Sequence, residues 1–436
     1  MRMVIESHQS GSWCKAAEVQ FLAPEAGIQG ETLVSYDADY FFDLAVVDAM
    51  NADVIDCRAL SVSHPVSMND QRAPHWPAWL LDLLPQGVAR QKIARDAGLA
   101  ANDPAVEVHL LRRAGGSPIG NLRIREAWRE EQERLRDVQC PPLTDEDIDS
   151  RSESFLEVVD RFAHLASGSS GVQGEWPKAL MTRSTVDGFW YPDPFVPTDE
   201  GCEHMIVKLL RSSQDSDRAI LESEAPYLEV ARHFGLNVAT PLGMRDGLLR
   251  MPRFDRSVAG GDVLLHGQES LVSALGIAGF GYRGSHEEAL RRIQAVSDDP
   301  AADTIEYIQR DLLNLAMGNP DNHGRNTALA KPATGGVRLS PLFDFVPMRL
   351  SDAGIPRVMR WACLEGRDME GDWGLVCAAA AFDGLDAGRI RNALLEKMPA
   401  LEALPQTARE IGVREDVIQR CIDTDRLVQA IAKLDE

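Results

Sequence analysis

Three oxygen-bearing side chains lie in two short stretches of the C-terminal half of the chain. The stretch GNPDNHGRNTALA at 318–330 holds Asp321 and, five positions later, Asn326. The stretch VRLSPLFDFVPM at 337–348 holds Asp344. Carboxylate and amide oxygens are the ligands that Mg²⁺ takes from proteins, usually one or two of them beside phosphate and water. These side chains therefore predict a magnesium site for phosphoryl transfer, a reaction in which the protein mainly positions groups and neutralises charge.

The spacing of these residues supports that chemistry. In protein kinases the catalytic aspartate and the metal-binding asparagine are also five positions apart, as Asp321 and Asn326 are. Asp344 precedes Phe345, as the second metal-binding aspartate of kinases precedes a phenylalanine. Two short strands joined by a turn at 332–336 would return the chain to its start, so we expect Asp344 to share a metal with Asn326. Taken alone, each stretch can also be interpreted as an ordinary turn.

His323 lies between the first two of these residues, and its role has two interpretations. The imidazole can touch a substrate or a phosphate, or it can hydrogen-bond locally and hold the loop in shape. We treat it, with Asp321, as a candidate catalytic residue. The other histidines show no HxxxH or HExxH spacing, and no GxxxxGK[ST], GxSxG or Rossmann motif occurs, which disfavours a zinc site and these other catalytic classes.

A lysine interrupts a short apolar segment in the middle of the chain. Lys208 lies in HMIVKLL at 204–210, which predicts a buried strand, and a buried ammonium group requires an anionic partner. The phosphates of ATP would supply one, and Glu222 or Glu224 in the next helix can form an ion pair with this lysine. The alternative is a lysine on the solvent face of an edge strand.

The segment SGSSGVQGEWPK at 167–178 is rich in Gly and Ser. Backbone N–H groups of such a loop can approach phosphates, whereas the alternative is a flexible linker. The chain thus holds, in order, a small loop, a lysine strand, an acidic helix, an Asp/Asn loop and a second metal aspartate. Chance agreement with this whole order is far less frequent than agreement with any one part.

Hydrophobic spacing predicts the elements that position these residues. Apolar residues recur at three-to-four spacing in 76–84, which predicts an amphipathic helix that ends near Pro85. Residues 179–191 predict a hairpin. Residues 219–234 predict a helix that ends at Gly235, because glycine favours the position after a helix.

The order of elements predicts an α+β, bilobal, protein-kinase-like fold, with a β-rich N-terminal lobe and a mostly helical C-terminal lobe. A charged segment with Pro141-Pro142 marks one boundary. The predicted domains are an N-terminal subdomain at 1–145, a small lobe of ATP-binding strands at 146–262, and a helical large lobe at 263–436.

Composition excludes several other classes. With 45 basic and 67 acidic residues the net charge is −22, which disfavours binding to bare nucleic acid. The seven cysteines form no CxxC pair, which argues against a disulfide framework or a zinc site. No signal peptide and no run of 18 apolar residues is visible. We therefore expect a cytoplasmic protein with no membrane contact.

At this point the chain resembles the HipA family, the kinase toxins of bacterial HipBA toxin–antitoxin modules. The resemblance covers roughly residues 30–430 and keeps the order of the family's motifs. The segments that carry it are LLDLLPQGVAR (80–90), GGSPIGNLRI (115–124), GVQGEWPKALM (171–181), HMIVKLL, ESEAPYLEVARHFGLNVA (222–239), MPRFDR (251–256), GNPDNHGRN and LSPLFDF.

The resemblance implies roles for individual residues. It makes Asp321 the catalytic aspartate, with Asn326 and Asp344 as Mg²⁺ ligands. The implied ATP-binding residues are Lys208, Glu224, Gln173, Pro252, Arg253, Phe254 and Asp255, of which Pro252 to Phe254 would line the adenine through backbone atoms. The family's autophosphorylated serine would align with Gly168, so the candidate autophosphorylation sites are its neighbours Ser167, Ser169 and Ser170.

The resemblance also implies a function. We expect a serine/threonine protein kinase toxin that uses ATP and Mg²⁺ to phosphorylate a protein, such as an aminoacyl-tRNA synthetase or another translation component, and so arrests growth. A HipB-like helix-turn-helix antitoxin would be its partner and would bring DNA only indirectly. Two alternatives stay open: a small-molecule kinase of the same fold, and a catalytically silent co-repressor that binds the antitoxin. The silent co-repressor is disfavoured because Lys208, Asp321, Asn326 and Asp344 are all present.

Overall fold

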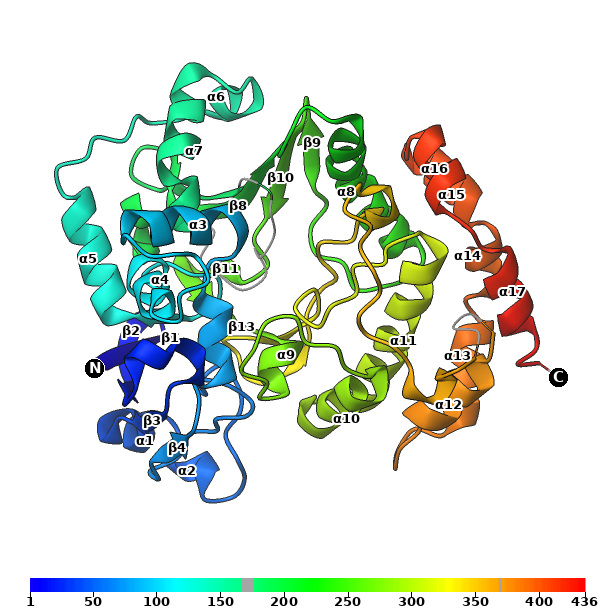
Figure 1. Ribbon diagram of the computed structural model, residues 1–436, viewed down its shortest axis with the longest axis horizontal. Helices are drawn as coiled ribbons and strands as arrows, with labels where there is room; N and C mark the ends of the chain where they lie inside the picture. The colour runs from blue at the N-terminus through cyan, green and yellow to red at the C-terminus, as the bar shows by residue number, and fades with distance from the viewer. Residues whose placement is uncertain (167–175, 177, 368–370, 436) are drawn as a thin grey trace. The chain divides into compact units, whose positions relative to one another are not determined.

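The computed structural model describes residues 1–166, 176, 178–367 and 371–435. Its helices and strands separate into two compact units (Figure 1). Unit one holds Met1–Arg211, Arg250–Phe280 and Ala328–Val337, and unit two holds Ser212–Leu249, Gly281–Thr327 and Arg338–Glu436. The three-domain division at 145/146 and 262/263 stays a prediction.

Unit one begins with a five-stranded sheet in the order β4-β3-β2-β1-β5. Its strands are β1 (Arg2–Gln9), β2 (Ser12–Phe21), β3 (Thr32–Tyr36), β4 (Gln71–Ala73) and β5 (Leu122–Ile124). β1 and β2 pair antiparallel through a two-residue turn in which Ser10 and Gly11 both have positive φ, 49° and 81°. A turn of this hand matches the twist of the strands that it joins. Ile5 and Val19, one from each strand, are fully buried in the core.

Short helices pack against this sheet and against one another. They are η1 (Pro24–Gln29), α1 (Ala38–Leu44), α2 (Val46–Ala49), η2 (Ala78–Leu83), α3 (Gly87–Asp96), α4 (Val106–Ala114) and α5 (Arg125–Leu135). The amphipathic helix predicted at 76–84 is wrong. Only the 3-10 helix η2 forms there, and every one of its residues is buried, so the segment has no polar face to expose.

The second sheet of unit one is built around β8 (Gly201–Leu209), which carries Lys208. β6 (Lys178–Ser184) pairs antiparallel with β8 on one side, and β10 (Leu248–Pro252) lies on the other. The alternative of an edge strand for Lys208 is therefore wrong. The predicted hairpin is confirmed by the pairing of β6 with β7 (Trp190–Pro192). The helices before β6 are α6 (Asp145–Asp149) and α7 (Glu153–Ala166), and those between β7 and β8 are η3 (Asp193–Phe195) and η4 (Thr198–Glu200).

Two further strand pairs complete unit one. β11 (Arg256–Ala259) pairs with β12 (Asp262–Leu265), and β13 (Gly267–Ser270) pairs with β14 (Ala328–Lys331), both antiparallel. The short helix α9 (Leu271–Ala274) follows β13.

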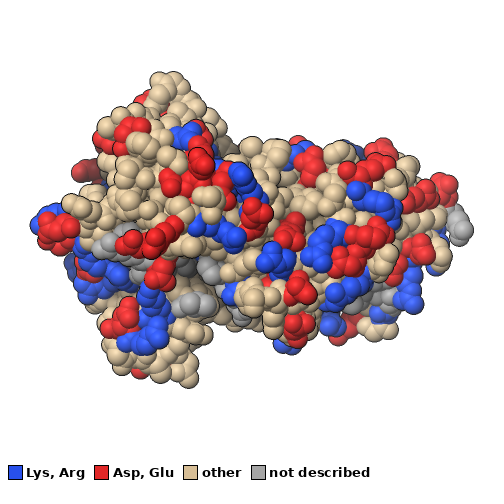
Figure 2. Space-filling model, turned by 90° about the horizontal axis from the view of Figure 1, so that it is seen from above, with Lys and Arg blue, Asp and Glu red and all other residues tan. Residues whose placement is uncertain are grey.

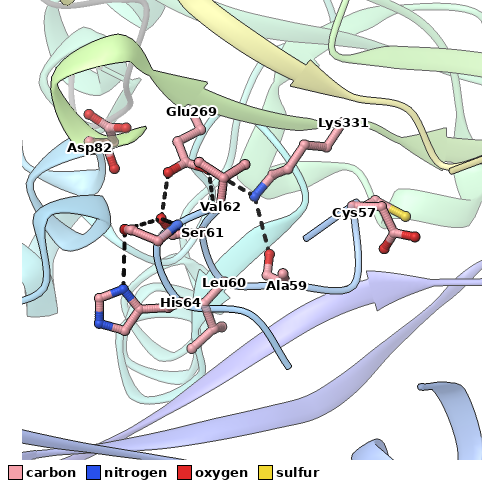
Figure 3. Close-up of polar contacts among 12 residues, drawn as sticks. Cys57, Ala59, Leu60, Ser61, Val62, His64, Asp82, Glu269 and Lys331 are labelled. Carbon is pink, nitrogen blue, oxygen red and sulfur yellow. Dashed lines mark hydrogen bonds and ion pairs between the residues drawn. The ribbon is translucent and has the colours of Figure 1, made fainter. Parts of the chain in front are cut away.

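A buried ion pair links β13 and β14 to a loop near the first sheet (Figure 3). Lys331 Nζ lies 3.2 Å from Glu269 Oε2 and donates to the carbonyl oxygen of Ala59 at 3.2 Å. The same carboxylate accepts from the Ser61 hydroxyl at 2.5 Å and from the Val62 N–H at 2.9 Å. Both charged side chains are about 2% exposed, so this pair holds three distant stretches of the chain together.

Unit two is mostly helical. Its elements are α8 (Asp215–His233), β9 (Gly243–Arg245), α10 (His286–Val296), α11 (Pro300–Ala316), β15 (Arg338–Leu339), η5 (Met348–Leu350), η6 (Ala362–Leu364), α12 (Trp373–Ala380), α13 (Ala387–Leu395), α14 (Met398–Glu402), α15 (Leu404–Ile411), α16 (Glu415–Cys421) and α17 (Asp425–Ala432). The predicted helix at 219–234 corresponds to α8, whose C-cap is Phe234 and is followed by Gly235 with φ 90°.

Local sequence explains how α10 and α11 begin, and the two helices lie side by side (Figure 1). The Ser285 hydroxyl accepts from the N–H of Glu288 at 3.1 Å, and Asp299 Oδ1 accepts from that of Ala302 at 3.0 Å. Such caps satisfy N–H groups that have no partner inside the first turn. Within the described ranges, no helix is both long and apolar enough to cross a membrane.

Candidate active site

The loop with Asp321 leaves the end of α11 through a tight turn at Gly318. Gly318 has φ 65°, and a Cβ there would lie 2.6 Å from the carbonyl oxygen of Cys421, so any larger residue would force the two segments apart. The next residue, Asn319, is buried, and its N–H and side-chain amide both donate to Asn314, at 2.9 Å and 2.8 Å. The entry to the loop is therefore fixed by the last turns of the helix.

Hydrogen bonds inside the loop bring Asp321 and Asn326 together. The Asn326 Nδ2 group donates to the backbone oxygen of Asp321 at 3.0 Å, and the Asp321 N–H donates to Asn319 Oδ1 at 3.3 Å. Because the nitrogen of the Asn326 amide is used within the loop, its orientation is set, and the oxygen of the same amide is the atom that a metal would require.

His323 makes the local contacts that the second interpretation predicted. Its Nδ1 accepts from the N–H of Arg325 at 3.3 Å, and its Nε2 lies 3.5 Å from Asp321 Oδ1. A ring that accepts at Nδ1 carries its proton on Nε2, which faces the carboxylate. The imidazole thus lies beside the Asp321 carboxylate, and a contact between His323 and a substrate stays a prediction.

The second stretch places Asp344 in an unusual backbone conformation. Asp344 has φ 52°, in the left-handed region that residues other than glycine rarely adopt. Phe345, the next residue, is 1% exposed, and its ring lies 5.6 Å from that of Tyr227 on α8. The Tyr227 hydroxyl donates to the backbone oxygen of Met317 at 3.2 Å. Packing of Phe345 thus offsets a strained backbone, and such strain is commonest at functional sites.

Asp321, Asn326 and Asp344 line the same pocket of unit two. The pocket has a volume of about 30 Å³, enough for an ion and a water molecule but not for a nucleotide. Two carboxylates and one amide oxygen suit Mg²⁺, which keeps phosphate and water in its other positions. In the described parts of the chain, no three His, Cys, Asp or Glu side chains gather to hold a metal.

A buried polar network forms one wall of this pocket. Asp311 of α11 accepts from Arg357 and, at 2.9 Å, from Trp361 Nε1, and it lies 3.4 Å from His286 Nε2. Burial raises the pKa of Asp311, but the charge of Arg357 and these hydrogen bonds outweigh burial and hold that pKa below its usual value. Burial in turn lowers the pKa of His286, whose Nδ1 lies 2.9 Å from the Tyr307 hydroxyl.

The segment that contains Arg357 and Trp361 also holds the Asp321 loop. Asn322 Oδ1 accepts from the N–H groups of Val358 and Met359, at 3.1 Å and 3.2 Å, and Asn322 Nδ2 donates to the Met359 oxygen at 2.8 Å. Residues 357–361 are therefore bonded to Asp311 at one point and to the loop at another. Sequence spacing did not identify Asp311 or Asn322; polar residues at core-facing positions of a helix were the available signal.

Lys208 is buried in unit one, 2% exposed, and its Nζ lies 5.7 Å from the ring centre of Trp176. The strand register places Lys178, also buried, directly opposite it. Two ammonium groups on paired residues of a sheet favour an anion nearby, because like charges that face each other repel.

The two glutamates that were candidates for pairing with Lys208 lie in different surroundings. The Glu222 carboxylate lies 3.4 Å from Arg218 and 3.4 Å from Arg414, on the surface of unit two. Glu224 is instead 1% exposed within α8. Glu224 is therefore the better candidate, and its pairing with Lys208 stays a prediction.

The MPRFDR segment has a structural role that its sequence did not reveal. The Arg253 side chain is fully buried and forms ion pairs with Asp193 and Asp255. Burial raises the pKa of Asp255, but the charge and hydrogen bonds of Arg253 outweigh it and hold that pKa at about 2. Asp255 also accepts from the N–H of Gly120 at 2.9 Å. Contact of Arg253 or Asp255 with a nucleotide through their side chains would break these pairs, which leaves backbone contact, as predicted for Pro252 to Phe254.

Some predicted site residues cannot be placed. Gln173 and the candidate autophosphorylation sites Ser167, Ser169 and Ser170 lie outside the described residues.

Comparison with known proteins identifies the family. Residues 170–423, more than half of the chain, match the model of the HipA-like C-terminal domain. The chain belongs to this family of HipA-like kinases. The resemblance found in its motifs is therefore confirmed.

Two similar proteins support this assignment. The chain is 26% identical over 282 residues to the Sinorhizobium fredii protein named “Putative kinase Y4mE”, an alignment that covers 61% of this chain and only 62% of that protein. Among solved structures, HipA of Shewanella oneidensis MR-1, determined with HipB and its operator DNA, matches 99% of this chain and 94% of its own, with a TM-score of 0.59 and 17% identity. The predicted α+β, protein-kinase-like HipA fold is confirmed.

Proposed function

We propose that this chain is a serine/threonine protein kinase that transfers the γ-phosphate of ATP to a protein hydroxyl. The observation that carries the proposal is that Asp321, Asn326 and Asp344, predicted from two separate stretches, line one pocket. The family of HipA-like kinases supports a kinase activity, and the strained backbone at Asp344 supports a functional role for this residue.

In this proposal each residue has one task. The oxygen of the acceptor hydroxyl forms a bond to the γ-phosphorus, and Asp321 accepts the proton of that hydroxyl. The bond from the γ-phosphorus to the β-phosphate oxygen breaks, so that ADP leaves. Asn326 Oδ1 and the Asp344 carboxylate hold Mg²⁺, which neutralises charge on the phosphates when bound. Lys208 contacts a phosphate, Glu224 orients this lysine, and the backbone of Pro252 to Phe254 receives the adenine.

A labelling experiment tests this proposal. The full chain, its Asp321→Ala variant and an Asp383→Ala control are incubated with γ-labelled ATP, Mg²⁺ and a cell extract. Asp383 is an exposed aspartate of unit two that does not line the pocket, so this control should behave as wild type. We expect label on a protein band with wild type and control, and none with Asp321→Ala. Label on small molecules alone would identify a small-molecule kinase, and no label with wild type would contradict any kinase activity.

We also propose that the kinase is the toxin of a HipBA-like module with a helix-turn-helix antitoxin as partner. The support is the family, together with a solved structure of similar fold that was determined with HipB and operator DNA. An acidic chain of net charge −22 would reach DNA through such a partner and not directly. The protein substrate would be an aminoacyl-tRNA synthetase or another translation component.

Growth and phosphoproteomics separate the toxin from other kinases. Induced expression of wild type should stop growth, and Asp321→Ala should relieve the arrest. Comparison of phosphopeptides between the two strains should reveal a translation component as the substrate, and it should show whether Ser167, Ser169 or Ser170 is phosphorylated. Unimpaired growth together with active phosphate transfer would refute the toxin and leave the kinase.

A further inference from the structure

A larger pocket lies within unit one, between α3, α4 and α5. Its volume is about 230 Å³, against about 30 Å³ for the pocket of the candidate active site. None of the residues proposed above for catalysis or nucleotide binding lines it. The charged or titratable side chains in its wall are Asp96, His109, Arg112, Arg113, Glu130 and Arg134.

Only one of the three arginines has a carboxylate partner. Arg112 is paired with Glu130, to which its Nε donates at 3.1 Å. In the part of the chain that the structure describes, Arg113 and Arg134 make no ion pair or hydrogen bond to a carboxylate. The pocket thus presents two guanidinium groups that form no direct ion pair within the described residues, on a chain whose net charge is −22.

The two guanidinium groups also repel each other. The pKa of Arg134 is lowered first by burial and then by the positive charge of Arg113, and the negative charges of Glu131 and Glu130 offset only part of this. An arginine does not relieve such repulsion by losing its proton near neutral pH, because its pKa stays far above that range. An anion between the two side chains would relieve it.

A simpler explanation accounts for each arginine but not for the pair. Arg113 lies in the last turn of α4 and Arg134 in the last turn of α5, where a cation interacts favourably with the helix dipole. That preference requires neither a cavity nor a second guanidinium group beside the first. Figure 2 shows that basic and acidic side chains both occur over one face of the molecule.

We propose that this pocket binds the phosphate group of a small phosphorylated molecule. Arginine presents its N–H groups in a planar fork that matches two phosphate oxygens, and two such forks from two helices can hold one dianion. The pocket has room for the phosphate and for a small body attached to it. Inorganic phosphate and an organic phosphomonoester share this chemistry. The site is separate from the nucleotide site proposed above, so its test does not depend on kinase activity.

Calorimetric titration of the full chain tests the proposal, with inorganic phosphate and glycerol 3-phosphate as probes at constant ionic strength. We expect saturable binding to wild type and a loss of at least about tenfold in affinity for the double variant Arg113→Gln/Arg134→Gln. The matched control is Arg95→Gln/Arg129→Gln, which removes two exposed arginines of α3 and α5 outside the pocket and should bind as wild type. Circular dichroism verifies that the variants fold.

A third variant separates this pocket from the nucleotide site. Binding that persists in Lys208→Ala and is lost in Arg113→Gln/Arg134→Gln belongs to the pocket. Equal affinity for the two probes would identify the phosphate group as the whole ligand, and tighter binding of glycerol 3-phosphate would show that the pocket also recognises the organic body. Binding that is unchanged in the double variant, binding that is lost in Lys208→Ala, or no saturable binding up to about 10 mM would each overturn the proposal.

Discussion

Arg253 in unit one and the Asp321–Asp344 pocket in unit two show two uses of charged residues. Arg253 is fully buried between Asp193 and Asp255, and its charge is balanced within the fold. In the pocket, Asp321 is about a quarter exposed, and the hydrogen bonds around it fix the backbone and its neighbours Asn322 and Asn326. Balanced, inaccessible charges favour a structural role, whereas oxygens that line an accessible pocket on a rigid loop favour a chemical one.

Replacement of Arg253 should have the largest effect on stability. Arg253→Met leaves two buried carboxylates whose remaining cation, Arg256, lies 3.4 Å from one and 3.9 Å from the other. Loss of one partner of a buried ion pair costs about 3–5 kcal/mol. Urea denaturation should show this loss in the free energy of unfolding.

A control and a rescue sharpen that prediction. Arg409→Met breaks an ion pair on the surface and should leave the urea midpoint unchanged. The double variant Asp193→Asn/Arg253→Met should recover part of the stability, because the remaining carboxylate, Asp255, still has Arg256 beside it at 3.9 Å and the buried charges balance again. Equal midpoints for wild type and Arg253→Met would show that the cluster has no structural role.

The second prediction concerns the metal site. Asp344→Asn keeps a residue that tolerates a left-handed backbone but removes the negative charge. We expect Mg²⁺-dependent binding of ATP to weaken by about 100-fold, while the free energy of unfolding stays close to that of wild type. Fluorescence titration with an ATP analogue at several Mg²⁺ concentrations measures the affinity.

The matched control has the same residue type in the same conformation. Asp246 has φ 46° and is exposed in unit two, outside the pocket. Asp246→Asn should bind nucleotide as wild type does. If both variants lost affinity equally, the loss would not be specific to the pocket, and Asp344 would not be a metal ligand.

The sequence predicted the fold class, which is confirmed, and it named three residues that line one pocket, but it did not predict every element correctly. The five-residue interval from Asp321 to Asn326 and the aspartate before Phe345 are local patterns, and local patterns are preserved in a loop. The segment 76–84 failed because its apolar spacing also fits a chain buried on all sides, which no single-segment pattern distinguishes from an amphipathic helix. Burial on every side is a property of the tertiary fold.

The roles of Arg253 and Asp311 could not be predicted for a related reason. Their partners lie 60 and 46 positions away in sequence, for the contacts to Asp193 and Arg357. A charged residue in a sequence does not reveal whether its partner is another side chain or a ligand. Only the folded contacts show that Arg253 and Asp255 are partners of each other and that Asp311 supports residues 357–361.

The third prediction concerns the stability of the fold at low pH. The pKa of Asp255 is held at about 2 in the folded chain, against a usual value of 3.8. Its contribution to stability is therefore complete above about pH 4 and is lost as the pH falls toward 2, with a magnitude of about 2 kcal/mol. Urea unfolding of wild type and Asp255→Asn should differ at pH 5 and should converge near pH 2. A difference that stayed constant across this range would show that the pKa of Asp255 is not lowered.

The smallest effect is expected for Asp311, which has no contact with substrate in the proposed mechanism and positions residues 357–361. Asp311→Asn leaves Arg357 without its buried carboxylate and weakens the bond to Trp361, so these residues should hold the Asp321 loop less firmly through Asn322. We expect kcat to fall about tenfold with little change in nucleotide affinity, because Asn326 and Asp344 keep their positions.

Asp303 of the same helix α11 provides the control for this prediction. It is also buried, and it accepts from Arg338 and from the N–H of Leu339, but it does not line the pocket. Asp303→Asn should lower the free energy of unfolding without lowering kcat of the folded fraction. The Trp361 indole adds a second measurement, since loss of its hydrogen bond should shift tryptophan emission in Asp311→Asn and not in Asp303→Asn. If both variants lowered kcat equally, Asp311 would only support the helix; if only Asp311→Asn did so, the link from Asp311 through residues 357–361 to Asn322 would be what holds Asp321 in position.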